Sequence, residues 1–200
     1  EVTAKTHSAG KLTNGRTRAD HLAHLDPDLI ESAYPREPGW RPLFGQVDAA
    51  QSVLAREEVG PGDLFLFFGW FRRATSSGGR LRYVPGAPDL HVIWGWMQIG
   101  TVVPVGSVEH PSWMSYHPHI ASPRGRGNTV YVARENLALD GIDLDLPGAG
   151  VFDLYDDRLR LTKKGSNRST WELPSWFAPS DSRPPLGYHG DPDRWHVDGD

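Results

Sequence analysis

Asp63–Arg73 reads DLFLFFGWFRR, and His91–Gly100 reads HVIWGWMQIG. Each stretch has the length of a β-strand and is apolar at successive positions, which indicates strands that are covered on both faces. Each also contains a Gly-Trp pair, and a glycine inside a strand marks a bulge or the close approach of a ligand or another backbone. The indoles beside these glycines either stack on a flat ring or fill a core, and both interpretations remain open.

The rest of the chain predicts one clear helix and several short strands. Val47–Val59 places Ala49, Ala50, Val53 and Leu54 on one face, and Gly60-Pro61 ends it. We expect further strands or hairpins at the following places: Ser76–Gly79 turning into Leu81–Val84, a continuation of the second aromatic strand through Thr101–Val105, Asn128–Ala133, a hairpin of Gly150–Tyr155 with Arg158–Thr162, and a short strand or turn in Ser169–Phe177.

These elements predict an α+β, β-rich fold. We expect a small, barrel-like mixed sheet with one or two packed helices, of the PUA-like kind that binds RNA or bases. Residues 1–19 have no hydrophobic period and are expected to form a flexible lead-in, and residues 20–200 a single domain. The Pro-, Gly- and His-rich stretch Ser107–Arg126 is a long loop, and such loops usually serve a function.

Composition narrows the classes of function. The chain has no cysteine, so it has neither a thiolate nucleophile nor a Cys-based zinc site, and a cytoplasmic location without a membrane span is expected. A net charge of −4 is not typical of a protein that binds DNA through basic surface alone. The signatures GxSxG, P-loop, GxGxxG and HExxH are absent from the sequence, which leaves serine hydrolase, NTPase and dehydrogenase chemistry without support.

Two polar clusters contain residue types that bind metals or transfer protons. His24, Asp26 and Asp28 form an HxDxD pattern, and alternate residues of an extended segment point to the same side. His117 and His119 form an HxH pattern that suits zinc or iron. We predict Asp26, Asp28 and His117 as catalytic groups, and His24, His117 and His119 as ligands of a divalent metal of unknown identity. The alternative for both clusters is that they cap turns and fix loop shape.

A second set of residues suits the binding of a base or nucleotide. Aromatic rings stack on bases, amides read base edges by paired hydrogen bonds, and guanidinium groups bind phosphates. Trp94 and Trp96 have the same parity on their strand, and core packing is the competing role for at least one of them. The predicted substrate-binding residues are Trp70, Trp94, Trp96, Gln98, Arg72, Arg73 and Asn128.

Several longer motifs extend over nearly all of residues 20–196. They are HLDPDL at His24–Leu29, GWRPLFGQV at Gly39–Val47, GDLFLFFGWFR at Gly62–Arg72, APDLHVIWGWMQIG at Ala87–Gly100, HPH at His117–His119, NTVYVA at Asn128–Ala133, WELPSWF at Trp171–Phe177, and YH and RW at Tyr188-His189 and Arg194-Trp195. Together these motifs resemble the third type of the nucleotide-modification-associated domain families. The resemblance implies a DNA base-modifying protein with a nucleotide or DNA base as its ligand, and proteins of DNA modification systems as partners.

Residues and resemblance together leave three functions open. The first is a nucleotide- or base-modifying enzyme that holds its substrate in a tryptophan-lined pocket with metal assistance, and it is the function that we favour. The second is a non-catalytic reader that binds a modified base or nucleotide. The third is a structural subunit of a modification complex, in which exposed indoles contact another protein.

Overall fold

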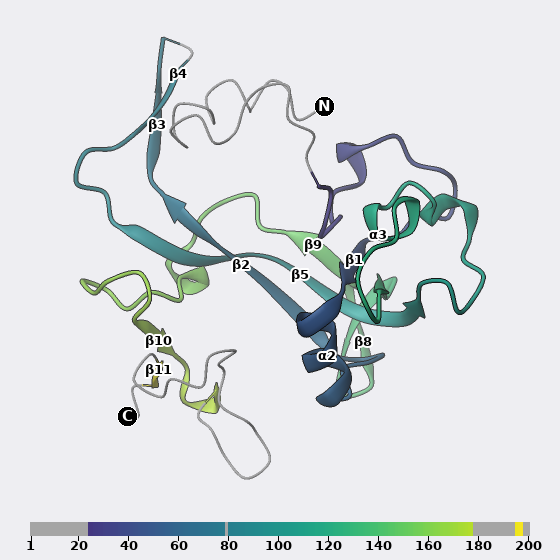
Figure 1. Cartoon of the computed structure of the whole chain (residues 1–200). Helices are drawn as coiled ribbons and strands as arrows, with labels where there is room; N and C mark the ends of the chain where they lie inside the picture. The colour runs from purple at the N-terminus through teal and green to yellow at the C-terminus, as the bar shows by residue number, and fades with distance from the viewer. Residues whose placement is uncertain (1–23, 79, 178–194, 198–200) are drawn as a thin grey trace. The chain divides into compact units, whose positions relative to one another are not determined.

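The computed structural model describes residues 24–78, 80–177 and 195–197, and strands dominate it (Figure 1). The lead-in predicted for residues 1–19 lies outside these described residues. In chain order, the elements are η1 Glu31–Ala33, β1 Leu43–Gln46, α2 Asp48–Arg56, β2 Leu64–Arg72, β3 Ala74–Ser77, β4 Arg80–Tyr83, β5 Asp89–Pro104, η2 Ser112–Met114, α3 Pro118–Ala121, β6 Thr129–Ala133, β7 Asn136–Leu139, β8 Ile142–Pro147, β9 Ala149–Val151, η3 Asp157–Leu159, β10 Trp171–Leu173, η4 Ser175–Phe177 and β11 Trp195–Val197.

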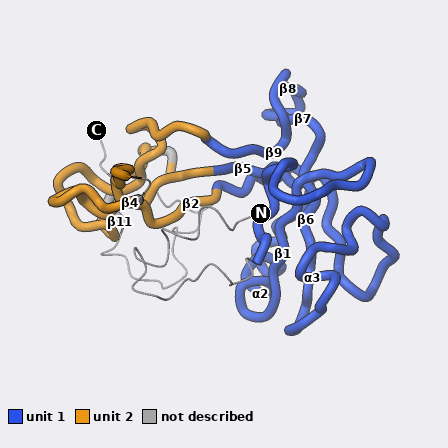
Figure 2. Tube along the Cα trace, turned by 90° about the horizontal axis from the view of Figure 1, so that it is seen from above, with its two compact units in different colours: residues 1–66, 95–152 blue, residues 67–94, 153–200 orange. Residues whose placement is uncertain are grey.

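The chain folds as two compact units (Figure 2). Unit 1 consists of residues 1–66 and 95–152, and unit 2 of residues 67–94 and 153–200. The main sheet has the strand order β1-β6-β5-β2, with β9 paired to β5. The β1/β6, β6/β5 and β5/β9 pairs are antiparallel. The predicted β-rich α+β class is confirmed, and the closer likeness to PUA-like barrels stays a prediction.

The core of unit 1 lies on the face of β1 and β6 that is turned toward η2 and α3. Leu43 of β1 and Val130 of β6 are fully buried there, and Met114 of η2 packs against them. Since Gly45 has the same parity as Leu43, it faces the same side of the sheet. This arrangement brings the segment with the predicted histidines against the backbone of β1.

The other face of β1 and β6 carries an aromatic cluster beside helix α2. The ring of Tyr131 lies 5.2 Å from that of Phe65, and Phe65 lies 5.0 Å from Phe44. The Tyr131 hydroxyl donates to Oε1 of Gln51, the buried residue of α2. The helix is shorter than the predicted Val47–Val59, because Glu58 adopts a left-handed φ of 53° that ends it.

Unit 2 has its own small core and a β-hairpin. Leu161, Trp171 and Leu173 are buried, and Ile93 packs against them. The hairpin of β3 with β4 has Ser76 opposite Leu81, which confirms the predicted turn over the Ser-Gly stretch. Strand β10 pairs with β11 in parallel.

Three expectations about the strands can be compared directly with the structure. The second aromatic strand does continue beyond Gly100, because β5 runs from Asp89 to Pro104. Burial of both faces of the first aromatic strand was wrong: β2 alternates between exposed and half-buried residues, so one of its faces is open to solvent. The hairpin of 150–155 with 158–162 was also wrong. β9 pairs with β5 instead, and Asp156 caps the short helix η3 by accepting from the Arg158 backbone N–H.

Within the described ranges, none of the helices has both the length and the apolar character needed to cross a bilayer.

The packing of His91 in unit 2 leads to a testable pH dependence. Trp171 donates from Nε1 to Nδ1 of His91 at 2.9 Å, which requires that this nitrogen be unprotonated. Burial, and then the positive charge of Arg168, lower the pKa of His91 below 6.5. The neutral ring therefore contributes stability above about pH 6.5, and this contribution is lost as the pH falls from there toward the lowered pKa.

We expect the free energy of unfolding to fall between pH 7.5 and pH 5 more steeply in the wild type than in His91→Asn. Asparagine keeps an acceptor for the Trp171 N–H but does not titrate. Urea denaturation at a series of pH values measures the difference, and the other histidines cancel in the comparison. Parallel pH profiles for the two proteins would show that His91 does not couple to folding.

Candidate metal centre

The extended segment before η1 is held against strand β1 by backbone hydrogen bonds. Asp28 N–H donates to the Leu43 carbonyl at 2.8 Å, and Leu43 N–H donates to the Asp28 carbonyl at 3.0 Å. Two residues away on each strand, Gly45 N–H donates to Oδ1 of Asp26 at 2.8 Å. The Asp26 carboxylate is therefore fixed beside β1, with its other oxygen free for partners from elsewhere.

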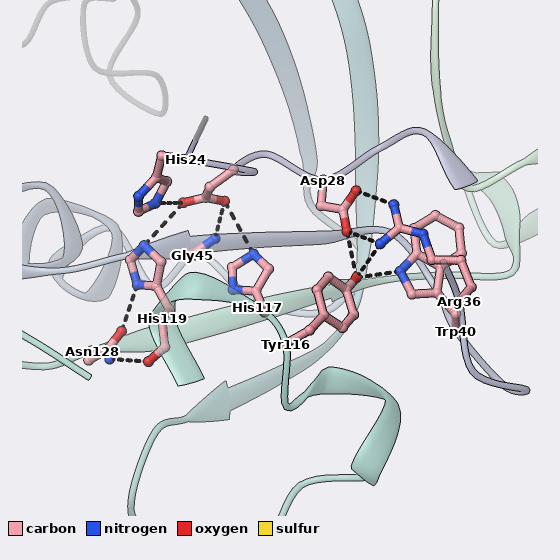
Figure 3. A network of polar contacts seen from close by, with 10 residues as sticks. His24, Asp28, Arg36, Trp40, Gly45, Tyr116, His117, His119 and Asn128 are labelled. Carbon is pink, nitrogen blue, oxygen red and sulfur yellow. Dashed lines mark hydrogen bonds and ion pairs between the residues drawn. The ribbon is translucent and has the colours of Figure 1, made fainter. Parts of the chain in front are cut away.

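Three imidazole rings surround this carboxylate (Figure 3). Asp26 Oδ2 lies 3.1 Å from Nε2 of His119 and 3.7 Å from Nε2 of His24. Asp26 Oδ1 lies 3.6 Å from Nε2 of His117. His24, Asp26 and His119 could hold a metal ion, since each offers a ligand atom and these atoms all lie within 4.8 Å of one another.

The orientation of His119 is set by Asn128. The Asn128 amide donates from Nδ2 to the backbone carbonyl of His119 at 2.8 Å, and its Oδ1 lies 2.7 Å from Nδ1 of the same ring. An amide oxygen can only accept, so Nδ1 must carry the proton. In the neutral ring, Nε2 then carries a lone pair that points at the Asp26 carboxylate. This contact is repulsive unless a proton or a metal ion lies between the nitrogen and the carboxylate oxygen.

His119 can approach β1 only because residue 45 is glycine. A Cβ atom at Gly45 would stand 2.4 Å from the His119 ring, which is far inside van der Waals contact. The HxH pattern, which the sequence placed in a long loop, lies in the first turn of α3, with His117 as its N-cap and Pro118 at N1. The two rings nevertheless lie near each other, with centroids 5.6 Å apart.

His117 is the most deeply buried member of the cluster. Its side chain is fully buried, and within the described part of the chain neither ring nitrogen has a hydrogen-bond partner. An imidazole that is removed from water without a partner costs free energy of folding. His24 is at the opposite extreme, with 64% of its side chain exposed, so the cluster is open to solvent on the His24 side.

Asp28 does not join the cluster but forms a buried ion pair next to it. Arg36 donates from Nη1 and Nη2 to the two oxygens of Asp28 at 2.7 and 2.6 Å. The Tyr116 hydroxyl donates to Asp28 Oδ2 at 2.5 Å and accepts from Trp40 Nε1 at 2.6 Å. Burial, followed by the hydrogen bond to Asp28, raises the pKa of Tyr116 well above its usual range. We call these four residues the Asp28 clamp (Figure 3).

Comparison with known proteins assigns the family. The sequence model of the family described as nucleotide modification associated domain 3 matches residues 2–200. The chain belongs to this family. Neither a curated protein nor a solved structure matches the chain. Membership supports a general role in nucleotide modification and confirms the resemblance inferred from the motifs.

The predicted base-binding residues of this nucleotide modification associated domain lie in different surroundings. Gln98 is buried, and its amide is engaged by the backbone: Nε2 donates to the carbonyls of Gly62 and Ala138, and Oε1 accepts from Ala138 N–H. Asn128 supports His119, as described above. Arg73 is exposed. Nε of Arg72 lies 3.9 Å from Oδ1 of Asp89.

The three tryptophans also differ in exposure. Trp96 packs over Gly150 and lies 4.9 Å from the ring of Phe152. Trp94 is half-buried against Phe67. Trp70 is 64% exposed, and the guanidinium carbon of Arg168 lies 3.9 Å from its ring centroid. Of the three, Trp70 is the indole with the most open surface.

Sequence reasoning missed Gly45, Arg36, Trp40 and Tyr116. Gly45, Arg36 and Trp40 lie in or near the GWRPLFGQV motif, and Tyr116 directly precedes the HPH motif. Gly45, Trp40 and Tyr116 have partners far away in sequence, as with Tyr116 and Asp28, which are 88 residues apart, so a fixed short spacing could not have revealed them. Arg36 lies only eight residues from Asp28, but that spacing is not part of a motif that predicts the contact.

The Asp28 clamp predicts a strong dependence of stability on Arg36. Only 6% of the Arg36 side chain and none of the Asp28 side chain is exposed, so Arg36→Met leaves a buried carboxylate without its counter-ion. We expect this change to lower the free energy of unfolding by about 3–5 kcal/mol, measured by urea denaturation.

Arg134→Met is the matched control. It removes the guanidinium from an exposed ion pair, in which the side chains of Arg134 and Asp143 are 39% and 67% exposed. The free energy of unfolding should fall by less than about 1 kcal/mol. Equal effects of the two substitutions would contradict the role assigned to the clamp.

Proposed function

We propose that this nucleotide modification associated domain is a metal-dependent enzyme acting on a nucleotide or a DNA base. In this proposal His24, Asp26 and His119 bind a divalent transition-metal ion. The observation that carries the proposal is the contact of Asp26 with His119. When the ring is neutral, Asn128 leaves its unprotonated nitrogen facing a carboxylate oxygen 3.1 Å away, and a cation between the two groups would convert repulsion into attraction.

The donor set supports a transition metal rather than magnesium or calcium. Imidazole nitrogens suit zinc, iron, copper and nickel, whereas magnesium and calcium prefer oxygen ligands. Two imidazoles and one carboxylate also leave coordination positions free for a substrate or water. When bound, such an ion would polarise a substrate oxygen or lower the pKa of a bound water.

The chain's own residues divide the remaining tasks. Gly45 N–H holds one Asp26 oxygen at 2.8 Å, which leaves the other oxygen for the ion. The exposed His24 lies on the side from which a substrate can enter. We assign His117 as the proton acceptor, because it lies beside Asp26 but outside the three-ligand set and has an unprotonated ring nitrogen when neutral.

A non-catalytic nucleotide reader is the second candidate function. It is favoured by the exposed Trp70 with Arg168 over its ring, since stacking and charge contacts with a base need no metal. Turnover separates the two functions: an enzyme changes the mass of the nucleotide, and a reader returns it unchanged.

Metal content tests the centre directly. We expect purified protein to bind about one equivalent of Zn²⁺ or Co²⁺ in titration calorimetry and to ignore Mg²⁺ at the same concentration. Asp26→Asn and His119→Ala should lose this binding because each removes a ligand. His110→Ala removes an imidazole from the same loop outside the cluster and should bind normally. Binding that survives in both ligand variants, or disappears in the His110 control, would place the ion elsewhere.

Activity of the loaded protein then tests the function. Nucleotides and DNA incubated with the metal-loaded wild type should show a change of base mass by mass spectrometry, and Asp26→Asn should produce none. His117→Gln should keep the metal but lose most of the product, because it lacks a basic ring nitrogen. Loss of metal from His117→Gln would make His117 a ligand instead of the proton acceptor.

The close contact at Gly45 gives a more selective test. Gly45→Ala places a methyl group 2.4 Å from the His119 ring and should displace it, so we expect metal affinity to fall by about 10- to 100-fold, as for other changes that disturb ligand orientation. Gly60→Ala is the control, since its Cβ would meet its nearest neighbour at 3.7 Å. Titration calorimetry on both variants, with thermal melts to check folding, gives the comparison. Unchanged affinity in Gly45→Ala would separate His119 from the centre.

A further inference from the structure

One face of strand β2 in unit 2 carries alternating aromatic and cationic side chains. Phe68, Trp70 and Arg72 are spaced by two residues, so they point to the same side, with neighbours about 6.6 Å apart along the strand. Phe68 is 49% and Trp70 64% exposed. We call Phe68, Trp70, Arg72, Tyr83 and Arg168 the aromatic-arginine face.

Two guanidinium groups accompany the rings of this face. Arg168 Cζ lies 3.9 Å from the centroid of Trp70, and Arg72 Cζ lies 5.1 Å from the centroid of Tyr83. Arg72 also lies 3.9 Å from Asp89, and both of these side chains are 36% exposed. A planar guanidinium stacked on a ring keeps its N–H groups at its edges for phosphates and presents its own plane to a base.

The charge of this part of unit 2 is opposite to that of the whole chain. Residues 67–94 and 153–177 contain nine Lys and Arg but five Asp and Glu, whereas the full chain has a net charge of −4. Two of the acidic groups, Asp156 and Asp157, are already paired with Arg158 and Arg160. Cations therefore outnumber anions in the two segments that carry the exposed rings and Arg168.

We propose that the aromatic-arginine face binds single-stranded nucleic acid, with bases stacking on Trp70 and Phe68 and phosphates contacting Arg72 and Arg168. Open rings together with cations are the combination used by proteins that bind single strands without reading their sequence. An unpaired strand fits better than a duplex, whose bases are already stacked on each other. An apolar protein surface fits poorly, because it would take two guanidinium groups out of water and offer them no hydrogen-bond acceptor.

This inference rests on the proposed function and deepens it, since it names a polynucleotide strand as the substrate class in place of a free mononucleotide. Binding to the face involves only residues of unit 2. It can therefore be measured without the metal centre, in the presence of EDTA.

Fluorescence anisotropy with a labelled oligothymidine of about 12 nucleotides tests the proposal. We expect saturable binding by the full chain and much weaker competition by thymidine monophosphate. Trp70→Ala should weaken binding by about 5- to 100-fold, and Trp70→Phe, which keeps a ring, should weaken it less. An oligouridine of the same length shows whether the face distinguishes DNA from RNA; equal binding of both strands supports contacts to bases and phosphates alone.

The salt dependence identifies the phosphate contacts. Arg168→Gln should reduce the slope of log K against log salt concentration by about 0.7, the value for one phosphate contact on a single strand. Arg124→Gln removes an equal charge from an exposed loop of unit 1 and should leave the slope unchanged. The same reduction in both variants would indicate only an effect of net charge and would overturn the assignment.

Other outcomes would overturn the proposal as a whole. These are the absence of oligonucleotide binding, unchanged binding in Trp70→Ala, or self-association in sedimentation that Trp70→Ala abolishes. Asp26→Asn is included to separate the two proposals and should bind the strand like the wild type. If the protein binds metal and turns over substrate but does not bind the strand, only the proposal for the aromatic-arginine face is wrong. If it binds the strand but shows neither metal binding nor turnover, only the proposed enzymatic function is wrong.

Discussion

The buried ion pair between Asp28 and Arg36 is the interaction on which the candidate centre depends. Asp28 lies two residues from Asp26, and its other hydrogen-bond partner, Tyr116, directly precedes His117. One carboxylate thus fixes both segments that supply the centre, although they are almost 90 residues apart in the sequence. A buried charge pair of this kind adds little net stability compared with apolar packing, but it is strongly destabilising to break, which makes it suited to fixing geometry.

The polar groups of unit 1 therefore divide into two sets with different chemistry. In the Asp28 clamp every charge is neutralised and each oxygen of the carboxylate accepts a hydrogen bond, so that set is complete. Around Asp26 the partners are the backbone N–H of Gly45 and imidazole nitrogens, so that set carries a positive charge only when a ring is protonated or a cation is bound. Within the described residues, the guanidinium of Arg36 contacts Asp28 and not Asp26, and this difference gives the two aspartates separate roles.

Local spacing revealed part of this arrangement in advance. HxDxD and HPH contain four of the groups that meet in space, His24, Asp26, His117 and His119, because metal-binding residue types stand out in a sequence. The spacing could not show that Asp28 and Asp26 have different roles. Arg36 pairs with Asp28 rather than Asp26 only because of tertiary packing. Apolar runs were equally ambiguous: the composition of β2 predicted two covered faces, yet one face is open, because exposure depends on what the rest of the chain places over a strand.

The Gly-Trp pairs show why burial decides the role of an indole. A Cβ at Gly95 would lie 3.0 Å from the Gly150 carbonyl, and one at Gly150 would lie 2.5 Å from the ring of Trp96. These glycines let β5 and β9 approach and let Trp96 cover their contact, so Trp96 serves packing. Gly69 likewise makes room for the rings of Phe71 and Trp94. At both pairs, the close approach that a strand glycine signals is thus made by the chain itself. Of the three candidate indoles Trp70, Trp94 and Trp96, Trp70 has the most exposed surface.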